Sequence, residues 1–269
     1  MNRRCRVLGV VAALCGVVVL ALPAAGPAAA AAKKAAVLRV LVTNDDGVGA
    51  PGIDAAVQAL RTLPRTVVTV VAPLTNQSGT GGKTTPGPLV ATKATTASGY
   101  PAEAVHGYPA DTVIWAVRDH GIRQRPDLVV SGINFGENVG PLATVSGTVG
   151  AAREAVRLGV PAVAASQGVD DGVTPDFSQG VVQLLAWVRA HRTALLAGRY
   201  RTPPSAALNV PTCPTGSVRG PVKAPLASSL TGINLGQVNC DDTTAPATFT
   251  DDAEAFVDGY AVLSPLYPS

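Results

Sequence analysis

The sequence predicts an α/β protein, in which a parallel sheet carries helices on both faces and an extended, β-rich appendage follows at the C-terminus. Two observations lead to this prediction. Short β-branched runs alternate along the chain with segments of helical periodicity, which is typical of a parallel sheet covered on both sides. After Pro203 the helical periodicity fades, and Pro, Gly, Thr and Ser become frequent.

The first elements are a strand, a helix and a second strand. The run AVLRVLV predicts a strand over residues 36–42, and TVVTVVAP predicts a buried strand over residues 66–73. Between them, residues 51–63 begin with Pro51, a residue favoured in the first helical turn. This segment is expected to be an amphipathic helix. Its apolar stripe consists of Ile53, Val57 and Leu60.

The middle of the chain repeats the alternation. Residues 111–122 predict a helix capped by Asp111, because aspartate accepts hydrogen bonds from the free N–H groups of a first turn. DLVVSG predicts a strand over residues 127–132, and TVGAAREAVRLG predicts a helix over residues 148–159 that Gly159 ends. The inward stripe of that helix is expected to contain Ala151, Ala155 and Leu158.

The last regular elements lie on either side of the change in composition at Pro203. VPAVAAS predicts a strand over residues 160–166, residues 176–192 predict a helix, and SAALNVP predicts one more strand over residues 205–211. The inward side chains of the helix are expected to be Val181, Leu184, Leu185 and Val188. We therefore expect an α/β core over residues 33–210 and a C-terminal extension over residues 211–269.

Residues 1–32 have the layout of a secretory signal. Arg3, Arg4 and Arg6 precede an apolar run over residues 7–22, and the small-residue stretch PAAGPAAAAA follows. The apolar run is short for a membrane span. We therefore expect cleavage near residues 30–32, a secreted protein and no stable membrane anchor.

Cysteine count and charge narrow the class of protein further. Of the four cysteines, two lie in the signal segment, which leaves Cys213 and Cys240. An even pair in an exported protein predicts a disulfide, although two free thiols are the alternative. The formal net charge is only +3, and no Lys/Arg cluster forms a stripe. A nucleic acid duplex is therefore not the expected partner.

Polar side chains follow the predicted strands at the edge where open parallel sheets bind ligands. Asp45 and Asp46 follow the first strand, Ser78 follows the second, and Asn134 follows the third. Adjacent acids can converge only where the chain turns, and Gly47 allows such a turn. Converging carboxylates repel unless one is protonated or a cation lies between them. Oxygen ligands favour Mg²⁺, Mn²⁺ or Ca²⁺ over Zn²⁺; a solvated acidic turn is the alternative.

The segment SGTVGAA predicts an anion site at the start of a helix. Ser146, Gly147 and Thr148 would offer free backbone N–H groups and two hydroxyls, which suit a phosphate. An ordinary helix cap is the alternative for these residues taken alone. A metal site and an anion site that face each other across strand tips indicate metal-assisted hydrolysis of a phosphoester.

Six motifs in register resemble the SurE family, the survival-protein 5'/3'-nucleotidases. They are VLVTNDDGVGAPG, VVAPLTNQSG, GYPADTV, DLVVSGINFGENVG, SGTVGAA and AFVDGYAVLSPL. They span roughly residues 38–266, nearly all of the mature chain. Together with the signal segment, they resemble a secreted, actinobacterial-type member of that family.

The resemblance implies a Rossmann-like core with a C-terminal extension, and a phosphatase for nucleoside monophosphates that depends on Mg²⁺ or Mn²⁺, with Ca²⁺ as a further option. It also implies a homodimer or tetramer. Matching positions imply Asp45 and Asp46 as catalytic residues and as metal ligands together with Ser78 and Asn134. They imply a phosphate site at Asn138, Ser146, Gly147 and Thr148.

Some positions depart from the family pattern, and the proton donor is left open. Gly49 stands where the family often has His, and residues 141–143 replace its usual acids and Tyr. Leu74 and Thr75 replace a usual charged pair. Asp46, ahead of Asp45, is expected to accept the proton of the attacking water. His106 is a weak candidate for the donor to the leaving oxygen, because a surface or structural role is the alternative.

Three other functions compete with metal-dependent hydrolysis of a phosphoester. A secreted protein could use the same cleft to bind nucleotides or phosphate without turnover. A dinucleotide-dependent oxidoreductase is disfavoured, because TNDDG stands where a G-x-G-x-x-G turn would bind the pyrophosphate. A serine hydrolase is disfavoured because the chain has no G-x-S-x-G elbow.

Overall fold

Strand β1 (Leu38–Thr43) lies in the interior of the sheet, where its apolar side chains are covered on both faces. Successive side chains of a strand point to opposite sides. Val40 and Val42 accordingly enter one hydrophobic cluster, and Leu41 enters the other. The computed structural model describes residues 36–169, 177–198, 200, 202–242, 244 and 248–267. The predicted signal segment and its cleavage point lie outside these residues.

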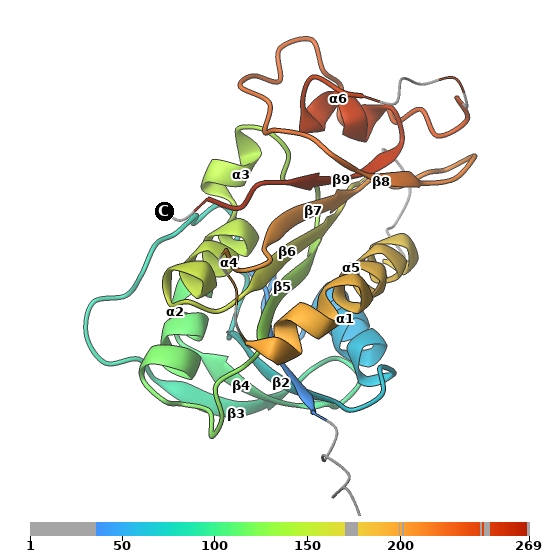
Figure 1. Ribbon diagram of the computed structural model, residues 1–269. Helices are drawn as coiled ribbons and strands as arrows, with labels where there is room; N and C mark the ends of the chain where they lie inside the picture. Colours follow the sequence, from blue (N-terminus) through green and yellow to red (C-terminus); the bar gives the residue numbers. More distant parts are fainter. Residues whose placement is uncertain are drawn as a thin grey trace, which may run out of the picture. The chain divides into compact units, whose positions relative to one another are not determined.

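The strands form one sheet in the order β3-β4-β2-β1-β5-β6-β7-β9-β8 (Figure 1). Strands β4, β2, β1, β5, β6 and β7 run parallel, β3 is antiparallel to β4, and β9 is antiparallel to β7. The bounds are β2 Thr66–Pro73, β3 Ala91–Thr95, β4 Pro101–Val105, β5 Leu128–Phe135, β6 Ala162–Gln167, β7 Ala206–Val210, β8 Arg219–Lys223 and β9 Tyr260–Ser264. The prediction of a mainly parallel, Rossmann-like α/β core is confirmed.

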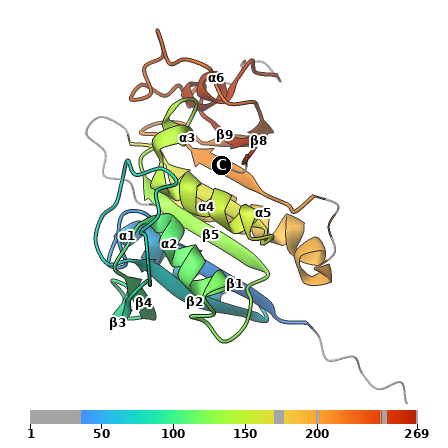
Figure 2. The same cartoon turned by 90° about the vertical axis from the view of Figure 1, so that its left-hand side faces the viewer.

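Helices cover both faces of the sheet. One face carries α1 (Pro51–Arg61) and α5 (Ser178–Ala197), and the other carries α2 (Pro109–Val113), a short π-helical continuation η1 (Ile114–Arg118) and α4 (Gly147–Arg157). Figure 2 shows α2 and α4 lying over one face. The short helix α3 (Leu142–Val145) directly precedes α4. None of the described helices combines the length and the apolar composition that crossing a membrane requires.

Most helix predictions are close to the observed bounds, but the cap at Asp111 is wrong. Helix α2 begins at Pro109, and Tyr108 is its N-cap. Asp111 is the third helical residue, and its carboxylate accepts hydrogen bonds from the backbone N–H groups of Tyr108 and Thr85. The helical run also ends at Arg118 rather than at residue 122.

The chain after β7 adds two strands to the sheet and also forms a helix outside it. Strand β9 inserts between β7 and β8, and a helix that was not predicted, α6 (Asp252–Val257), packs beside them. Phe256, Val262 and Val139 lie in one buried cluster there. The predicted disulfide is present between Cys213 and Cys240, which are 27 residues apart in sequence. The domain boundary at residue 210 stays a prediction.

Candidate metal and phosphate site at the strand tips

The two acids lie at the point where the strand order reverses. From β1 the chain continues to β2 on one side of the sheet, whereas β5 pairs with β1 on the other side. Ligands of open α/β sheets bind at such a switch point, beyond the carboxyl ends of the strands. Asp45 and Asp46 follow β1 at this position. The Phe135 N–H group at the tip of β5 donates to Asp46 Oδ2 at 3.2 Å.

Asp45 is held by the start of helix α4. The backbone N–H of Thr148 donates to Asp45 Oδ2 at 3.0 Å, and the Thr148 hydroxyl donates to Oδ1. Gly147 is required at the first helical position, because a Cβ atom there would lie 2.8 Å from the Asp45 Cβ and 2.9 Å from its Oδ2. The N-terminus of α4 therefore fixes the rotamer of Asp45.

Burial removes water from the carboxylates of Asp45 and Asp46, so their negative charges are poorly compensated. Burial raises the pKa of Asp45 above its ordinary value, although hydrogen bonds from Thr148 oppose the shift. Burial and the neighbouring charge of Asp45 raise the pKa of Asp46 to about 6, against a smaller opposing effect of the Phe135 N–H. A pair of carboxylates in this condition gains from a cation placed between or beside them.

The loop after β2 is anchored to the same place. The Gln77 N–H donates to the backbone oxygen of Asp45 at 2.7 Å, and the Gly81 N–H donates to the backbone oxygen of Val145 at 2.8 Å. Ser78, next to the first anchor, is exposed, and its N–H donates to Asn76 Oδ1. The predicted ligand Ser78 is therefore on a loop tied to the backbone of Asp45.

Asn134 lies at the end of β5, where the pairing with β6 shifts register between Ser131 and Asn134. Its side-chain N–H donates to the backbone oxygen of Gly136 at 2.8 Å. This bond directs the amide oxygen away from Gly136, so the oxygen is the end of the side chain suited to a cation. The nearby Asn44 Oδ1 is buried without a hydrogen-bond partner among the described residues.

These residues fit a hard divalent cation. Two carboxylates, a hydroxyl and an amide oxygen are the donor types that Mg²⁺, Mn²⁺ or Ca²⁺ prefers. Nowhere in the described part of the chain do three or more His, Cys, Asp or Glu side chains gather as a metal-binding group. The described residues therefore contain no cluster of the His and Cys ligands that Zn²⁺ usually takes.

The predicted phosphate-binding residues at the start of α4 differ in which of their donors are free. Ser146 caps α4 by accepting from the Val149 N–H, so its own hydroxyl hydrogen is still available to a ligand. The contact of Gly147 and Thr148 with a phosphate stays a prediction, and in this structure their N–H groups are directed at Asp45. The physical reason is that Asp45 is itself the anion at this helix start.

The hydrogen bonds of Asn138 and His106 go to residues other than Asp45 and Asp46. The Asn138 N–H donates to Asn209 Oδ1 at 2.7 Å, and its side-chain N–H donates to Ser166 Oγ at 2.9 Å. These bonds hold the loop after β5 to the tips of β6 and β7. His106 is exposed and lies beside Thr92 of β3. Its role as a proton donor stays a prediction.

A pocket of about 340 Å³ adjoins Asp46. Phe135, Phe177 and Asn76 line it, together with the first turn of α1. Sequence reasoning missed the two aromatic residues. The available signal was that Phe135 directly follows Asn134 at a strand tip, in a chain with only four phenylalanines.

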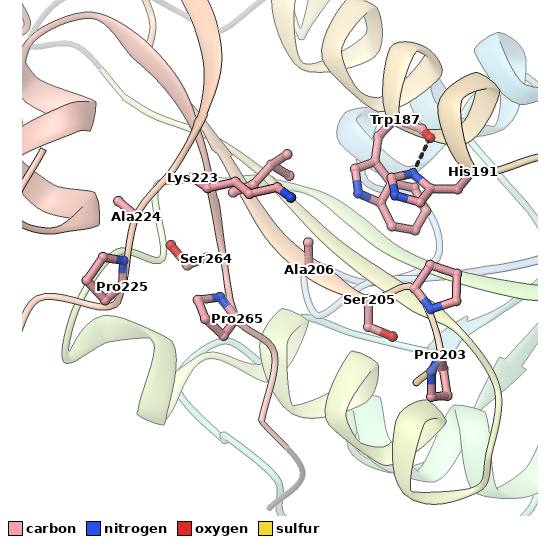
Figure 3. Close-up of a pocket in the computed structure, with 12 residues that line it drawn as sticks. Trp187, His191, Pro203, Ser205, Ala206, Lys223, Ala224, Pro225, Ser264 and Pro265 are labelled. Atoms are coloured by element: carbon pink, nitrogen blue, oxygen red, sulfur yellow. Dashed lines mark hydrogen bonds between the residues drawn. The ribbon is translucent and has the colours of Figure 1, made fainter. Parts of the chain in front are cut away.

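A larger cavity of about 500 Å³ lies at the opposite ends of the strands, beside Ala206 at the start of β7 (Figure 3). Trp187 and His191 of α5 line one side, and the His191 ring stacks on the Trp187 ring with centroids 4.2 Å apart. None of the described residues that line this cavity is acidic. It therefore lacks the ligands of a hard-cation site.

Comparisons with known proteins agree with this arrangement. The family model described as survival protein SurE matches residues 40–230. The 5'-nucleotidase SurE of Methanopyrus kandleri is 48% identical over 137 residues, which are 50% of each chain. The 5'-nucleotidase SurE of Brevibacillus brevis is 38% identical over 196 residues, covering 71% of this chain and 72% of that one. The match therefore spans between half and three quarters of these relatives.

The fold has a solved counterpart. The crystal structure of the SurE protein from Aquifex aeolicus superimposes with a TM-score of 0.66 at 27% sequence identity. The superposition covers 86% of this chain and 94% of that one. The likeness thus extends over most of this chain and nearly all of that one.

Proposed function

Because the chain belongs to the SurE family, we propose that it is a divalent-metal-dependent phosphomonoesterase, a 5'/3'-nucleotidase that converts nucleoside monophosphates to nucleoside and phosphate. One observation supports this most directly. Asp45 and Asp46 lie at the switch point of the sheet, where Asp46 accepts from the N–H of Phe135, the neighbour of Asn134, and the backbone of Asp45 accepts from the N–H of Gln77, the neighbour of Ser78. Metal dependence fits the family, whereas the choice among Mg²⁺, Mn²⁺ and Ca²⁺ is part of the proposal.

Asp45, Asp46, Ser78 and Asn134 would hold the cation. When bound, such a cation neutralises phosphate charge and makes a water molecule more acidic. Asp45 accepts from Thr148 on both oxygens, so it serves better as a fixed ligand than as a base. Asp46 accepts at Oδ2 from Phe135, and its Oδ1 is the carboxylate oxygen that we assign to the proton of the attacking water.

The phosphate would lie beside the acids, within reach of the Ser146 hydroxyl at the start of α4. The Ser146 hydroxyl can donate to a phosphate oxygen while its own oxygen keeps the helix cap. The contacts of Asn138, Gly147 and Thr148 with phosphate stay predictions; for Gly147 and Thr148 they would require exchange of the bonds to Asp45. We assign Thr148 a positioning role toward Asp45.

The direct test is phosphate release from AMP by the purified mature protein. We expect release with Mn²⁺ or Mg²⁺, loss of at least about 100-fold in rate with excess EDTA, and recovery after the cation is restored, because the cation provides much of the charge stabilisation. Magnesium-saturated EDTA is the control for nonspecific effects of the chelator. AMP that binds without phosphate release under all metals would favour the rival function, a secreted nucleotide-binding protein.

We also propose that the protein is secreted as a member of the actinobacterial type and that it assembles as a homodimer or tetramer. The Cys213–Cys240 disulfide supports an oxidising location, since disulfides persist mainly outside the reducing cytosol. Expression of the full chain should release a protein whose N-terminus, read by Edman degradation, lies near residues 31–33. An intact N-terminal arginine segment in the cell pellet would contradict secretion. Sedimentation equilibrium tests the number of subunits.

A further inference from the structure

We propose that the pocket beside Asp46 binds the base of a nucleotide, by stacking it on Phe135. The inference rests on the proposed function, since it takes the phosphate to lie at Asp45 and Asp46. It also narrows that function, because a base-binding pocket selects nucleotides over polyphosphate and over sugar phosphates. The occupant is a planar heteroaromatic ring with hydrogen-bond acceptors on its edge.

Phe135 joins the pocket to the acids. Its backbone N–H donates to Asp46 Oδ2 at 3.2 Å, while its side chain lines the pocket and is 51% exposed. A single exposed apolar residue is ordinary on a protein surface. Here the exposed ring belongs to the residue whose backbone N–H binds the Asp46 carboxylate, and the ring lines a cavity. Every nucleobase has a flat aromatic face that can stack on such a ring.

Another part of the pocket wall, formed by Phe177 and α1, is rigid. Phe177 is buried at 5% exposure and belongs to the main hydrophobic cluster. It packs so closely on α1 that a Cβ atom on Gly52 would lie 3.0 Å from the Phe177 ring and 2.0 Å from the backbone oxygen of Ile133. The first turn of α1 and the Phe177 ring therefore form a fixed apolar part of the pocket wall.

Asn76 gives the pocket a polar group. Its Oδ1 accepts from the Ser78 N–H at 2.8 Å, which leaves the two amide hydrogens as donors at the pocket wall. Every nucleobase carries edge acceptors that such donors can meet. The volume of about 340 Å³ lies near the lower end of the range of roughly 300–1,000 Å³ for small-molecule pockets. The pocket thus suits one nucleoside moiety.

The first measurement uses adenosine, which has no phosphate, and the metal-free protein in EDTA. Isothermal titration should detect adenosine binding to the wild type. Phe135→Ala and Phe135→Leu should weaken it about tenfold or more, because neither side chain can stack. Phe135→Tyr should bind adenosine about as well as the wild type, because the tyrosine ring can stack on the base. Tyr267→Ala, which removes another exposed aromatic side chain, is the matched control and should leave binding unchanged.

The second measurement compares two substrates with metal present. For AMP, Phe135→Ala should raise KM about tenfold with a smaller change in kcat, whereas the KM for ribose 5-phosphate should not change. Absence of adenosine binding to the wild type, or equal binding by Phe135→Ala in a folded protein, would overturn the base pocket. Failure of every phosphomonoester to release phosphate would instead overturn the proposed function, so the two failures are distinct.

Discussion

Replacing Asp45 by Asn is expected to abolish turnover of AMP while the fold persists. Asp45 is the acid that α4 holds in a single rotamer, so its charge is the part of the cation site with the least freedom. An amide oxygen is a weaker ligand than a carboxylate and leaves the site with one negative charge fewer. We expect kcat/KM to fall at least about 1,000-fold, which is about 4 kcal/mol of transition-state stabilisation.

The same substitution should be tolerated by the fold. The Asn oxygen can accept from the Thr148 N–H, and the Asn N–H can donate to the Thr148 hydroxyl, which is able to accept as well as donate. Burial raises the pKa of Asp45 because the charged form is poorly solvated, and Asn removes that charge. The melting temperature of the metal-free variant should therefore equal or exceed that of the wild type.

Thermal melts and AMP assays with saturating Mn²⁺ test both parts of this expectation. Asp119→Asn is the matched control, since Asp119 pairs with Arg118 at the end of η1. That variant should keep full activity. Activity of Asp45→Asn close to that of the wild type would contradict the assignment of Asp45, whereas an unfolded variant would contradict the hydrogen-bond exchange with Thr148.

The strand tips could be predicted from sequence because the relevant signals are local. Strand β2 matches its predicted bounds, residues 66–73, since an unbroken β-branched run is flanked by clear breakers. NDDG directly follows a strand, so its place at the carboxyl edge of the sheet needs only the rule for parallel sheets. The stripe of α1 was equally local, and Ile53, Val57 and Leu60 are fully buried.

The features that could not be predicted depend on contacts between residues that are distant in sequence, or lack a local signal. Thr148 binds Asp45 across 103 positions in sequence, and no motif indicates that the helix start would bind a side chain of the same protein rather than phosphate. The edge strand β3 is largely exposed, so it has no buried alternation to detect. The cap of α2 was misplaced because Asp111 was taken as the start of the helix, although Pro109 is the better signal for the first turn.

The C-terminal extension has its own connection to the site through Asp252, the first residue of α6. Its fully buried carboxylate accepts from the Gly140 N–H at 3.1 Å, the Ala227 N–H at 2.8 Å and the Ser264 hydroxyl at 3.3 Å. Gly140 belongs to the loop that carries Asn138. One side chain of the extension therefore holds the loop between β5 and α4 in place.

Asp252→Ala is expected to destabilise the protein by about 3 kcal/mol or more, because it leaves two N–H groups and a hydroxyl buried without an acceptor. The substitution also frees the loop after β5, which carries Asn138. The KM for AMP should therefore rise. Urea unfolding and AMP kinetics provide the two measurements.

Asp251→Ala is the matched control. Asp251 caps α6 by accepting from the Ala253 and Glu254 N–H groups, so its loss should cost about 1 kcal/mol of stability and leave the KM for AMP unchanged. Equal urea midpoints for the two variants would show that the buried carboxylate does not hold the loop, and the extension would then stabilise the site only through its apolar contacts.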